Sequence, residues 1–191
     1  MPSTDAPAAT ASTTKNAIRL AVSMFYFGQG LGFASWASRI PTIKADLGLS
    51  EAQLGTILLM LPIGQLLTMP LSATLVNKYG SGRILPQAAM LYALVLVLIA
   101  FSSNAWMLGA ALFLFGIFGN LSNISVNTQG VLAEDIYGRS IMSSFHGAWS
   151  LAGFTGALLG LLALNLHLTT ATHLLIIVAL LAINIIISKK N

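Results

Sequence analysis

The chain has 191 residues, of which 56% are hydrophobic and only 7% are charged. A soluble domain of this length carries about 25% charged residues, so the composition excludes an ordinary water-soluble globule and indicates an integral protein of the lipid bilayer. The net charge of +4 comes from scattered cations, which excludes a basic nucleic-acid surface, and the lack of cysteine excludes disulfides and thiolate metal sites.

The two ends of the chain are predicted to lie outside the membrane. Residues 1–16, MPSTDAPAATASTTKN, are rich in alanine, serine and threonine and contain no apolar run, so we predict a disordered cytoplasmic tail. The apolar run from Ala17 is long enough to span a membrane and has no obvious cleavage site, so we do not interpret it as a cleaved signal. Residues 189–191 are predicted to be a short cytoplasmic end.

Six apolar segments are predicted to be transmembrane helices, which gives an all-α integral membrane fold. A helix needs roughly 20 apolar residues to cross the hydrocarbon core. The predicted spans are residues 17–36, 54–75, 84–101, 106–132, 142–164 and 171–188. Ser50 and Gln53 in SEAQ predict a capping box at the start of the second helix, and Pro62 and Pro70 predict bends inside it.

The distribution of cations predicts the orientation of the bundle. The positive-inside rule places loops rich in lysine and arginine in the cytoplasm. With the amino terminus in the cytoplasm, only Arg39 and Lys44 lie outside, and the cations at the inner face are Lys15, Arg19, Lys78, Arg83, Arg139, Lys189 and Lys190. We therefore expect a multi-pass protein of the plasma membrane, the inner membrane of a bacterium, with both termini cytoplasmic.

The polarity of the predicted spans repeats after the third span, in a 3+3 pattern. The third and sixth spans are nearly pure hydrocarbon, whereas the first, fourth and fifth contain glutamine, asparagine, histidine, serine and glycine. This 3+3 pattern is typical of the inverted repeats from which transporters are built.

Three stretches of the sequence resemble a known family: GLGFASWASRIPTIKADLGLSEAQLG, LPIGQLLTMPLSATLVNKYGSGR and NTQGVLAEDIYGRSIMSSFHGAWSLAGFTGALLG. From about Phe25 to Gly160 the chain is similar to the amino-terminal half of major facilitator superfamily (MFS) transporters, in the branch of MosC-like and YbjJ-like membrane proteins. The resemblance implies secondary active transport by alternating access, with a substrate pathway between two six-helix halves. Such transporters have twelve spans, so a second half or a homodimer is the expected partner. The alternatives are a truncated protein or a scaffold without transport activity of its own.

The loop between the second and third spans departs from the family pattern. The family normally has an acid followed by an arginine, where this chain has Asn77 and Lys78. The arginine usual on the fourth span is also missing, so no buried charge is left without its partner. We expect Asn77, Lys78 and Arg83 to contribute to gating without that ion pair.

Three asparagines in the fourth span form a candidate pathway surface. Asn120, Asn123 and Asn127 are separated by helical steps of three and four and therefore share one face, which continues to Glu134. A carboxamide that faces lipid lacks partners, so this face must meet protein or water. One interpretation is bonding between helices, worth about 0.6–2 kcal/mol per bond. We favour the other, a substrate pathway, because three such residues are in register.

Other candidate site residues lie on the first and fifth spans. Gln29 is mid-span among glycines and is expected to face the pathway, as are His146 and Trp149. His146 is interpreted either as a bridge to the fourth span or as a coupling site. Every acid lies in the tail or near a span end, so proton coupling would have to involve His146 or Glu134. Arg39, at the outer end of the first span, is either a snorkelling cation or an extracellular gate.

The predicted pathway wall is rich in carboxamides and nearly uncharged. A neutral hydroxylated solute such as a sugar or cyclitol is therefore expected, since a phosphate ester would need an arginine pair. An intramembrane serine protease is disfavoured because the chain has no G-x-S-G motif. We expect no catalytic residue, no cofactor, no metal and no nucleic-acid partner.

Overall fold

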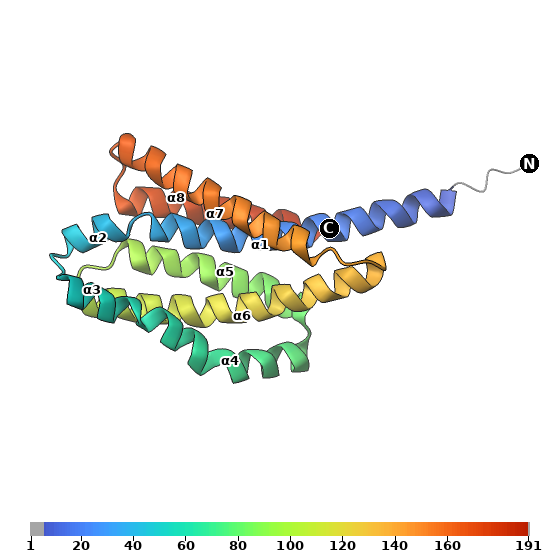
Figure 1. Ribbon diagram of the computed structural model, residues 1–191, viewed down its shortest axis with the longest axis horizontal. Coiled ribbons are helices and arrows are strands. Elements are labelled where there is room, and N and C mark those ends of the chain that lie inside the picture. Colours follow the sequence, from blue (N-terminus) through green and yellow to red (C-terminus); the bar gives the residue numbers. More distant parts are fainter. Residues whose placement is uncertain (1–5, 191) are drawn as a thin grey trace, which may run out of the picture.

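The computed structural model describes the backbone of residues 6–190 and the side chains of residues 15–189. Within these residues all regular structure is helical (Figure 1). The helices are α1 (Ala6–Ala37), α2 (Ile40–Asp46), α3 (Glu51–Leu58), α4 (Met60–Tyr79), α5 (Ser81–Ala100), α6 (Ala105–Tyr137), α7 (Met142–Asn165) and α8 (Thr170–Lys190).

Five helical segments are long and apolar enough to cross a membrane, which confirms a helical membrane protein. They are Glu51–Tyr79, Ser81–Ala100, Ala105–Tyr137, Met142–Asn165 and Thr170–Lys189. Each overlaps one of the predicted second to sixth spans. The helix that contains the predicted first span, α1, is less apolar and is not among the five.

The chain ends differ from the predicted disordered tail and cytoplasmic end. Helix α1 begins at Ala6, within the segment 1–16 that was predicted to be a disordered tail. Alanine has the highest helix propensity of all residues, and this segment is rich in it. Helix α8 likewise continues to Lys190. Residues 1–5 and 191 lie outside the described part of the chain.

The second span is divided into α3 and α4. The predicted capping box is confirmed at its start: Ser50 Oγ accepts from the amide of Gln53, and the Gln53 side chain accepts from the amide of Ser50. Helix α3 ends at Leu58 and α4 begins at Met60. Pro62 has no amide proton to donate to the carbonyl of Leu58, so the break lies one turn before the proline, as expected for this residue. Pro70 lies inside α4.

The short helix α2 was not predicted. It follows α1 directly and contains Pro41 in its first turn, where proline is tolerated because the first amides of a helix have no intrahelical acceptor. Lys44, in its last turn, forms an ion pair with Glu51 at the start of α3. The connection between α1 and α3 is therefore compact.

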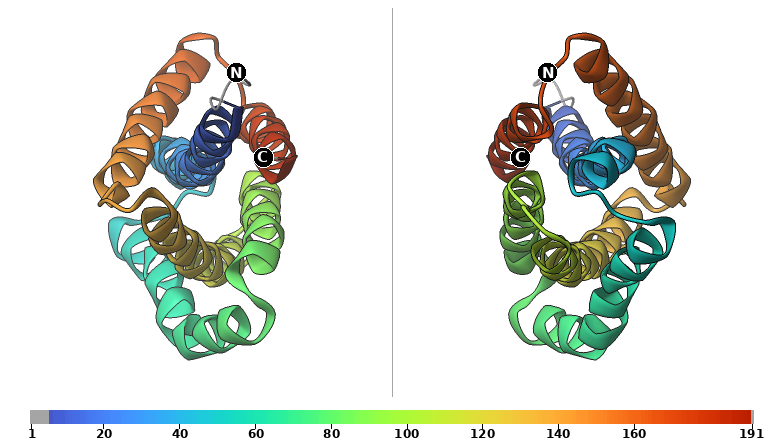
Figure 2. Two further views of the ribbon diagram at one scale, coloured as in Figure 1. Left: turned by 90° about the vertical axis from the view of Figure 1, so that its right-hand side faces the viewer. Right: turned by 90° about the vertical axis from the view of Figure 1, so that its left-hand side faces the viewer.

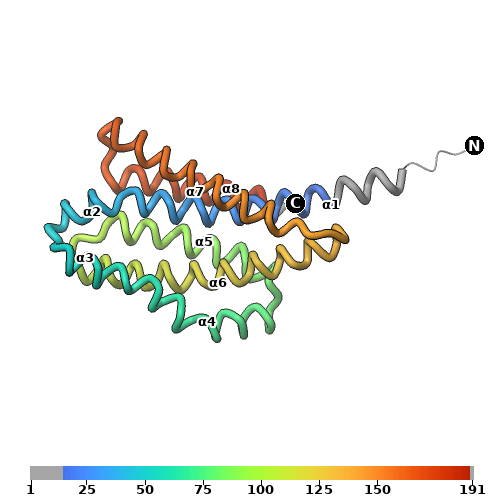
Figure 3. The backbone as a smooth tube through the Cα atoms, viewed as in Figure 1, coloured from blue at the N-terminus to red at the C-terminus, as the bar shows by residue number. Residues whose placement is uncertain are grey.

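The long helices form three closely contacting pairs, α1 with α7, α4 with α6 and α5 with α6. Helix α1 also packs against α8, and α5 joins α8. Figure 2 shows these helices end-on, and Figure 3 shows α7, α8 and α1 along one side of the bundle and α4 and α6 along the other.

Glycines bring the backbones together in two of these pairs, α4 with α6 and α1 with α7. A Cβ at Gly116 of α6 would meet the carbonyl oxygen of Leu61 on α4, and a Cβ at Gly64 would meet that of Phe113. In the other pair, a Cβ at Gly156 of α7 would lie 3.0 Å from the carbonyl oxygen of Leu31 on α1. Small residues at such contacts are the usual means by which membrane helices approach closely.

Candidate functional site

A cavity of about 160 Å³ lies among α1, α4, α5, α6 and α7 and is the candidate site. It brings together three of the predicted pathway residues, Gln29, Asn123 and Trp149. The remaining lining residues are Phe33, Leu61, Gln65, Tyr92, Phe115 and Gly119. The cavity therefore combines three carboxamides with four aromatic rings and contains no charged side chain.

The Gln29 side chain is the most distinctive polar group of this cavity. Only 7% of Gln29 is exposed, and its Nε2 atom is buried without a hydrogen-bond partner among the described residues. An unsatisfied buried amide costs about 1–3 kcal/mol, so such a donor is retained where it serves a ligand or a rearranged state. Asn123 and Gln65 are exposed and lie on the opposite side of the cavity, on α6 and α4.

Aromatic side chains form the rest of the wall. The rings of Tyr92 and Phe115 are stacked with their centroids 4.3 Å apart, and both residues are buried. The Tyr92 hydroxyl donates to the backbone carbonyl of Gln29 at 3.3 Å, which joins α5 to the middle of α1. Phe33 and Trp149 are 41% and 39% exposed. Flat apolar faces beside amide groups suit a ligand with both C–H and O–H surfaces.

The structure separates the three asparagines of α6. Asn120 donates to Ser72 of α4 at 3.1 Å, and Asn127 accepts from the Tyr26 hydroxyl of α1 at 2.8 Å. Asn127 also donates to the backbone carbonyl of Asn123 at 2.8 Å. Two of the three side chains thus bond to neighbouring helices, and only Asn123 lines the cavity.

His146 lies near the asparagine face but does not bridge to it. The residue is exposed, and its ring packs edge-on against Tyr26 of α1, with centroids 5.4 Å apart. Tyr26 is in turn stacked on Phe145. The contacts of the described residues therefore join His146 to the first helix, and the expected hydrogen bond to α6 is absent among them.

Glu134 has a structural role at the start of α7. Its carboxylate accepts from the amides of Ile141 and Met142, at 2.6 and 2.8 Å, and from the Ser140 hydroxyl at 2.8 Å. The first amides of a helix lack intrahelical acceptors, so this carboxylate caps α7 from the preceding helix.

Arg39 is buried in a polar cluster at the other end of the bundle. Only 1% of the residue is exposed, so the interpretation as a snorkelling cation is wrong. Its Nε atom donates to Nδ1 of His173, in the first turn of α8, at 2.9 Å. Burial lowers the pKa of Arg39 from its usual value, while the charge of Asp46 acts in the opposite direction. Arg39 Nη2 and His173 Nε2 have no hydrogen-bond partner within residues 15–189.

The predicted gating residues Asn77 and Lys78, in the last turn of α4, and Arg83, in the first turn of α5, are all exposed. Lys78 lies over the ring of the adjacent Tyr79, 5.2 Å from its centroid. Asn77 and Arg83 make no side-chain hydrogen bond to another described residue. The structure thus places these three residues at the surface, at the end of the bundle where α1 begins.

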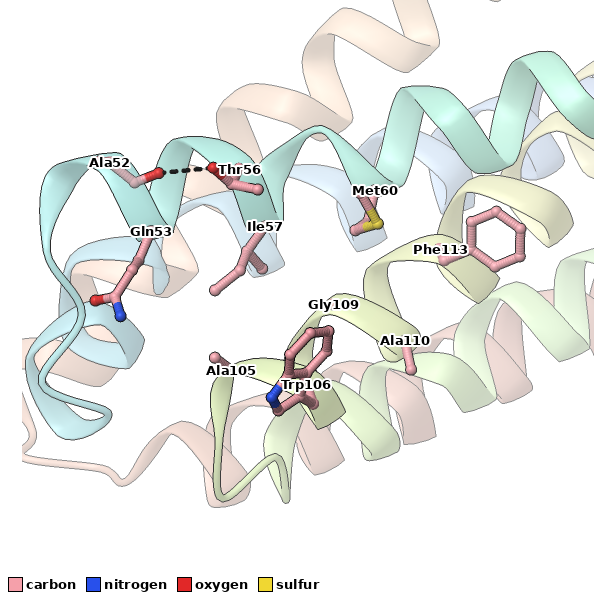
Figure 4. Close-up of a pocket in the computed structure, with 10 residues that line it drawn as sticks. All are labelled: Ala52, Gln53, Thr56, Ile57, Met60, Ala105, Trp106, Gly109, Ala110 and Phe113. Carbon is pink, nitrogen blue, oxygen red and sulfur yellow. Dashed lines mark hydrogen bonds between the residues drawn. The ribbon is translucent and has the colours of Figure 1, made fainter.

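A larger groove of about 640 Å³ lies between α3 and the start of α6 but offers little chemistry. Figure 4 shows that its wall consists mainly of apolar side chains, with Trp106 beside the groove. The polar groups are already bonded: Thr56 Oγ1 donates to the carbonyl of Ala52 at 2.9 Å, and Gln53 belongs to the capping box. The described residues contain no cluster of three histidine, aspartate or glutamate side chains that could hold a metal.

Several lining residues of the cavity were missed by sequence reasoning. Gln65 is the only carboxamide between residues 54 and 75, so the rule that singled out Gln29 would also have found it. Tyr92 lies in a span read as nearly pure hydrocarbon, and its role depends on contact with Gln29, 63 residues away. Phe33 and Phe115 carry no sequence signal that distinguishes them from packing residues.

Comparisons with known proteins identify relatives over most of the chain. It is 36% identical over 171 residues to an uncharacterized MFS-type transporter of Yersinia pestis. The matched region covers 87% of this chain and 44% of the relative. It is 29% identical over 147 residues to an uncharacterized transporter of Sinorhizobium fredii, covering 77% of this chain and 39% of that protein. The membrane protein MosC of Rhizobium meliloti is 33% identical over 142 residues, or 74% of this chain and 34% of MosC.

The chain thus spans less than half the length of these relatives. No family model matches the sequence. The resemblance identified from the three sequence stretches is confirmed by the names and identities of the relatives.

Proposed function

Because this chain belongs with the MFS-type transporters and matches less than half of their length, we propose that it is one half of a secondary active transporter. Its substrate in this proposal is a small neutral polar solute, moved by alternating access. A sugar or cyclitol fits this description. Gln29, Asn123 and Trp149 would contact the solute, whereas Asn120, Asn127 and His146 would support the pathway wall from neighbouring positions.

The cavity around Gln29 carries this proposal. It is about 160 Å³ in volume, and its wall supplies carboxamides and aromatic rings without a formal charge. The buried Nε2 of Gln29 has a hydrogen to donate and no described acceptor. A hydroxyl group of a bound solute would accept it, which makes binding favourable for a neutral hydrogen-bonding ligand.

The proposed architecture is a six-span half with a 3+3 repeat, in which α1 is the remaining span. Its support is the reciprocal packing of the helices. The first span (α1) packs against the fifth and sixth (α7 and α8), and the fourth (α6) packs against the second and third (α3–α4 and α5). This packing is expected for two inverted repeats of three helices in which the first helix of each repeat packs against the second and third helices of the other repeat.

The proposed location is the inner membrane, with both termini in the cytoplasm. Helix α1 begins and α8 ends at the same end of the bundle, as Figure 1 shows. Lys78, Arg83 and Arg139 belong to connections at that end, whereas Lys44 belongs to the opposite end. This distribution supports a cytoplasmic position for the end that carries the termini.

We further propose that a second six-helix half, or a second copy of this chain, completes the pathway. Phe33, Gln65, Asn123 and Trp149 line the cavity and are all exposed. The α3–α4 segment and α7 are the least buried of the five candidate spans. In the proposed transporter these surfaces would face the other half. Arg39, Glu134, Asn77, Lys78 and Arg83 remain candidates for gating or coupling, with Glu134 already engaged as a helix cap.

Uptake into vesicles tests the proposed function. The chain would be reconstituted with and without a second half and assayed with a panel of sugars and cyclitols, in the presence and absence of a pH gradient. Gln29→Leu should reduce uptake about tenfold, the equivalent of ~1.4 kcal/mol of lost binding. It should not lower the unfolding temperature, because the removed amide donor has no partner. Gln87→Leu, an exposed glutamine on α5 outside the cavity, is the matched control.

A scaffold without transport activity of its own is the second candidate. This candidate predicts no solute-dependent flux and no solute-dependent stabilisation for any member of the panel, even when a second half is supplied. That result would reject the proposed transport function.

A further inference from the structure

A separate cavity of about 180 Å³ lies at the end of the bundle where α1 begins and α8 ends. Four helices contribute to it, α1, α5, α6 and α8, so it lies on the other side of α1 from the α1–α7 contact. None of its lining residues belongs to the transport cavity described above. We call it the end cavity.

The lining of the end cavity changes from polar to apolar with depth. At its mouth are the exposed residues Lys189 of α8 and Gly82 at the start of α5, while the neighbouring Ser188 is buried and donates to the carbonyl of Asn184. Val22 and Phe25 of α1 are buried, and so is Leu85 of α5, one turn beyond Gly82. An amphipathic ligand with a polar head and an apolar chain matches this gradient, because each part would meet a surface of its own polarity.

The mouth of the end cavity carries positive charge without a compensating acid in the lining. Lys189 lines it, and Arg83 is adjacent in sequence to Gly82 and exposed. Glu134, the nearest acid in sequence to the lining residue Gln129, is engaged by the first amides of α7. The local field therefore favours an anion and offers no partner for an ammonium group.

Two further features favour a phosphate-sized group at this mouth. Helix α5 begins beside it, and its N-cap, Gly80, provides no side chain to satisfy the first amides. Gln129 donates to Ser81 Oγ at 2.7 Å, so its side chain is held over the start of α5, and its amide lies 3.5 Å from the position of a Cβ at Gly82. The absence of a Cβ at Gly82 keeps this part of the mouth open.

We propose that the end cavity binds an anionic phospholipid of the membrane leaflet on the side of the termini. Its phosphate lies between Lys189 and the start of α5, and the upper part of one acyl chain lies against Val22, Phe25 and Leu85. Basic pockets between membrane helices on the cytoplasmic side bind anionic headgroups in this manner. Only the choice of the cytoplasmic leaflet rests on the orientation proposed above.

Native mass spectrometry of the purified chain tests this proposal. Phosphatidylglycerol and phosphatidylcholine with identical acyl chains are added in equal amounts, and the lipid retained after release from detergent is measured. We expect about fivefold greater retention of phosphatidylglycerol. Lys189→Gln should bring retention down to the level of phosphatidylcholine, and Ala21→Trp, which fills the cavity from α1, should lower retention of both lipids.

Lys78→Gln is the matched control, because it removes the same charge at the same end of the bundle from a residue that does not line the cavity. It should leave the preference for phosphatidylglycerol unchanged. Equal retention of the two lipids, or an equal loss in both lysine variants, would overturn the proposal. Displacement by millimolar inorganic phosphate would show a free-phosphate site and would also overturn it. Lipid retention requires no transport, so failure here would leave the proposed transport function untouched.

Discussion

The Arg39 guanidinium is a buried cation whose hydrogen-bond partner is the neutral ring of a histidine. Its Nε–H needs an acceptor, and Nδ1 of His173 provides one at 2.9 Å from a helix 134 positions away in sequence. The ring must therefore carry its proton on Nε2. Such a bond, from a charged donor, is worth about 1.5–3 kcal/mol in a buried setting. The pair thereby holds the connection after α1 to the first turn of α8.

Loss of the acceptor should cost more than loss of the whole pair. His173→Leu leaves the buried guanidinium without its bond, and we expect the free energy of unfolding to fall by about 2–3 kcal/mol. The double variant Arg39→Leu/His173→Leu removes the charge as well and should recover part of that loss. Thermal unfolding in detergent measures both. The single variant Arg39→Leu completes the comparison: if the effects of the two single variants add up to that of the double variant, the bond between the side chains contributes nothing.

At the scale of helices, the close contact of α4 with α6 depends on residues without side chains. Gly116→Ala would place a methyl group against the backbone carbonyl of Leu61, which no rotamer change can relieve. We expect a loss of about 1–3 kcal/mol in the free energy of unfolding, as for other overpacked contacts. Gly153→Ala on α7 is the control, since a Cβ there meets no atom within 4 Å. The control should be neutral or stabilising by up to about 1 kcal/mol.

The start of α7 depends in the same way on a carboxylate from α6. Glu134→Ala removes the acceptor of three hydrogen bonds and should destabilise the protein by about 1–3 kcal/mol. Asp135→Ala, the adjacent exposed acid, should have no comparable effect. Circular dichroism on heating compares the two. An unchanged unfolding temperature for Glu134→Ala would exclude the capping role and strengthen its candidacy as a coupling residue.

Elements were predictable from sequence where the signal is local. The hydrogen bonds of the capping box join Ser50 to Gln53, only three residues away. The helix break before Pro62 follows from the missing amide proton of one residue. Both features are therefore predictable from a short stretch of sequence. Helix α2 was missed because its seven residues contain too few apolar positions for a span and no side-chain cap. Helix α1 begins at Ala6, before the predicted span from Ala17, because hydropathy indicates where a helix enters lipid and not where its backbone first becomes helical.

At the scale of the whole molecule, the absence of cysteine makes the orientation directly measurable. Ser103→Cys lies in the connection between α5 and α6, and Arg139→Cys lies between α6 and α7. With the termini in the cytoplasm, a membrane-impermeant maleimide should label the first variant in intact cells. It should label the second only after the membrane has been permeabilised. The reverse labelling pattern would contradict the proposed orientation.

The candidate site was only partly predictable, because its composition depends on how whole helices face one another. Asn120, Asn123 and Asn127 are equivalent by spacing, yet the positions of Ser72 and Tyr26 on other helices engage the first and last and leave Asn123 at the cavity. Helical periodicity assigns residues to a face of one helix. It contains no information about which residue of a second helix lies opposite, and that decides whether a carboxamide is available to a ligand.

The glycine contacts also determine how the bundle can deform. Helices α4 and α6, and likewise α1 and α7, meet backbone to backbone, so neither member of a pair can rotate about its own axis without a steric clash. We therefore expect each pair to move as one unit. Both pairs and α5 line the cavity around Gln29, so we expect its volume to change when one pair tilts relative to the other.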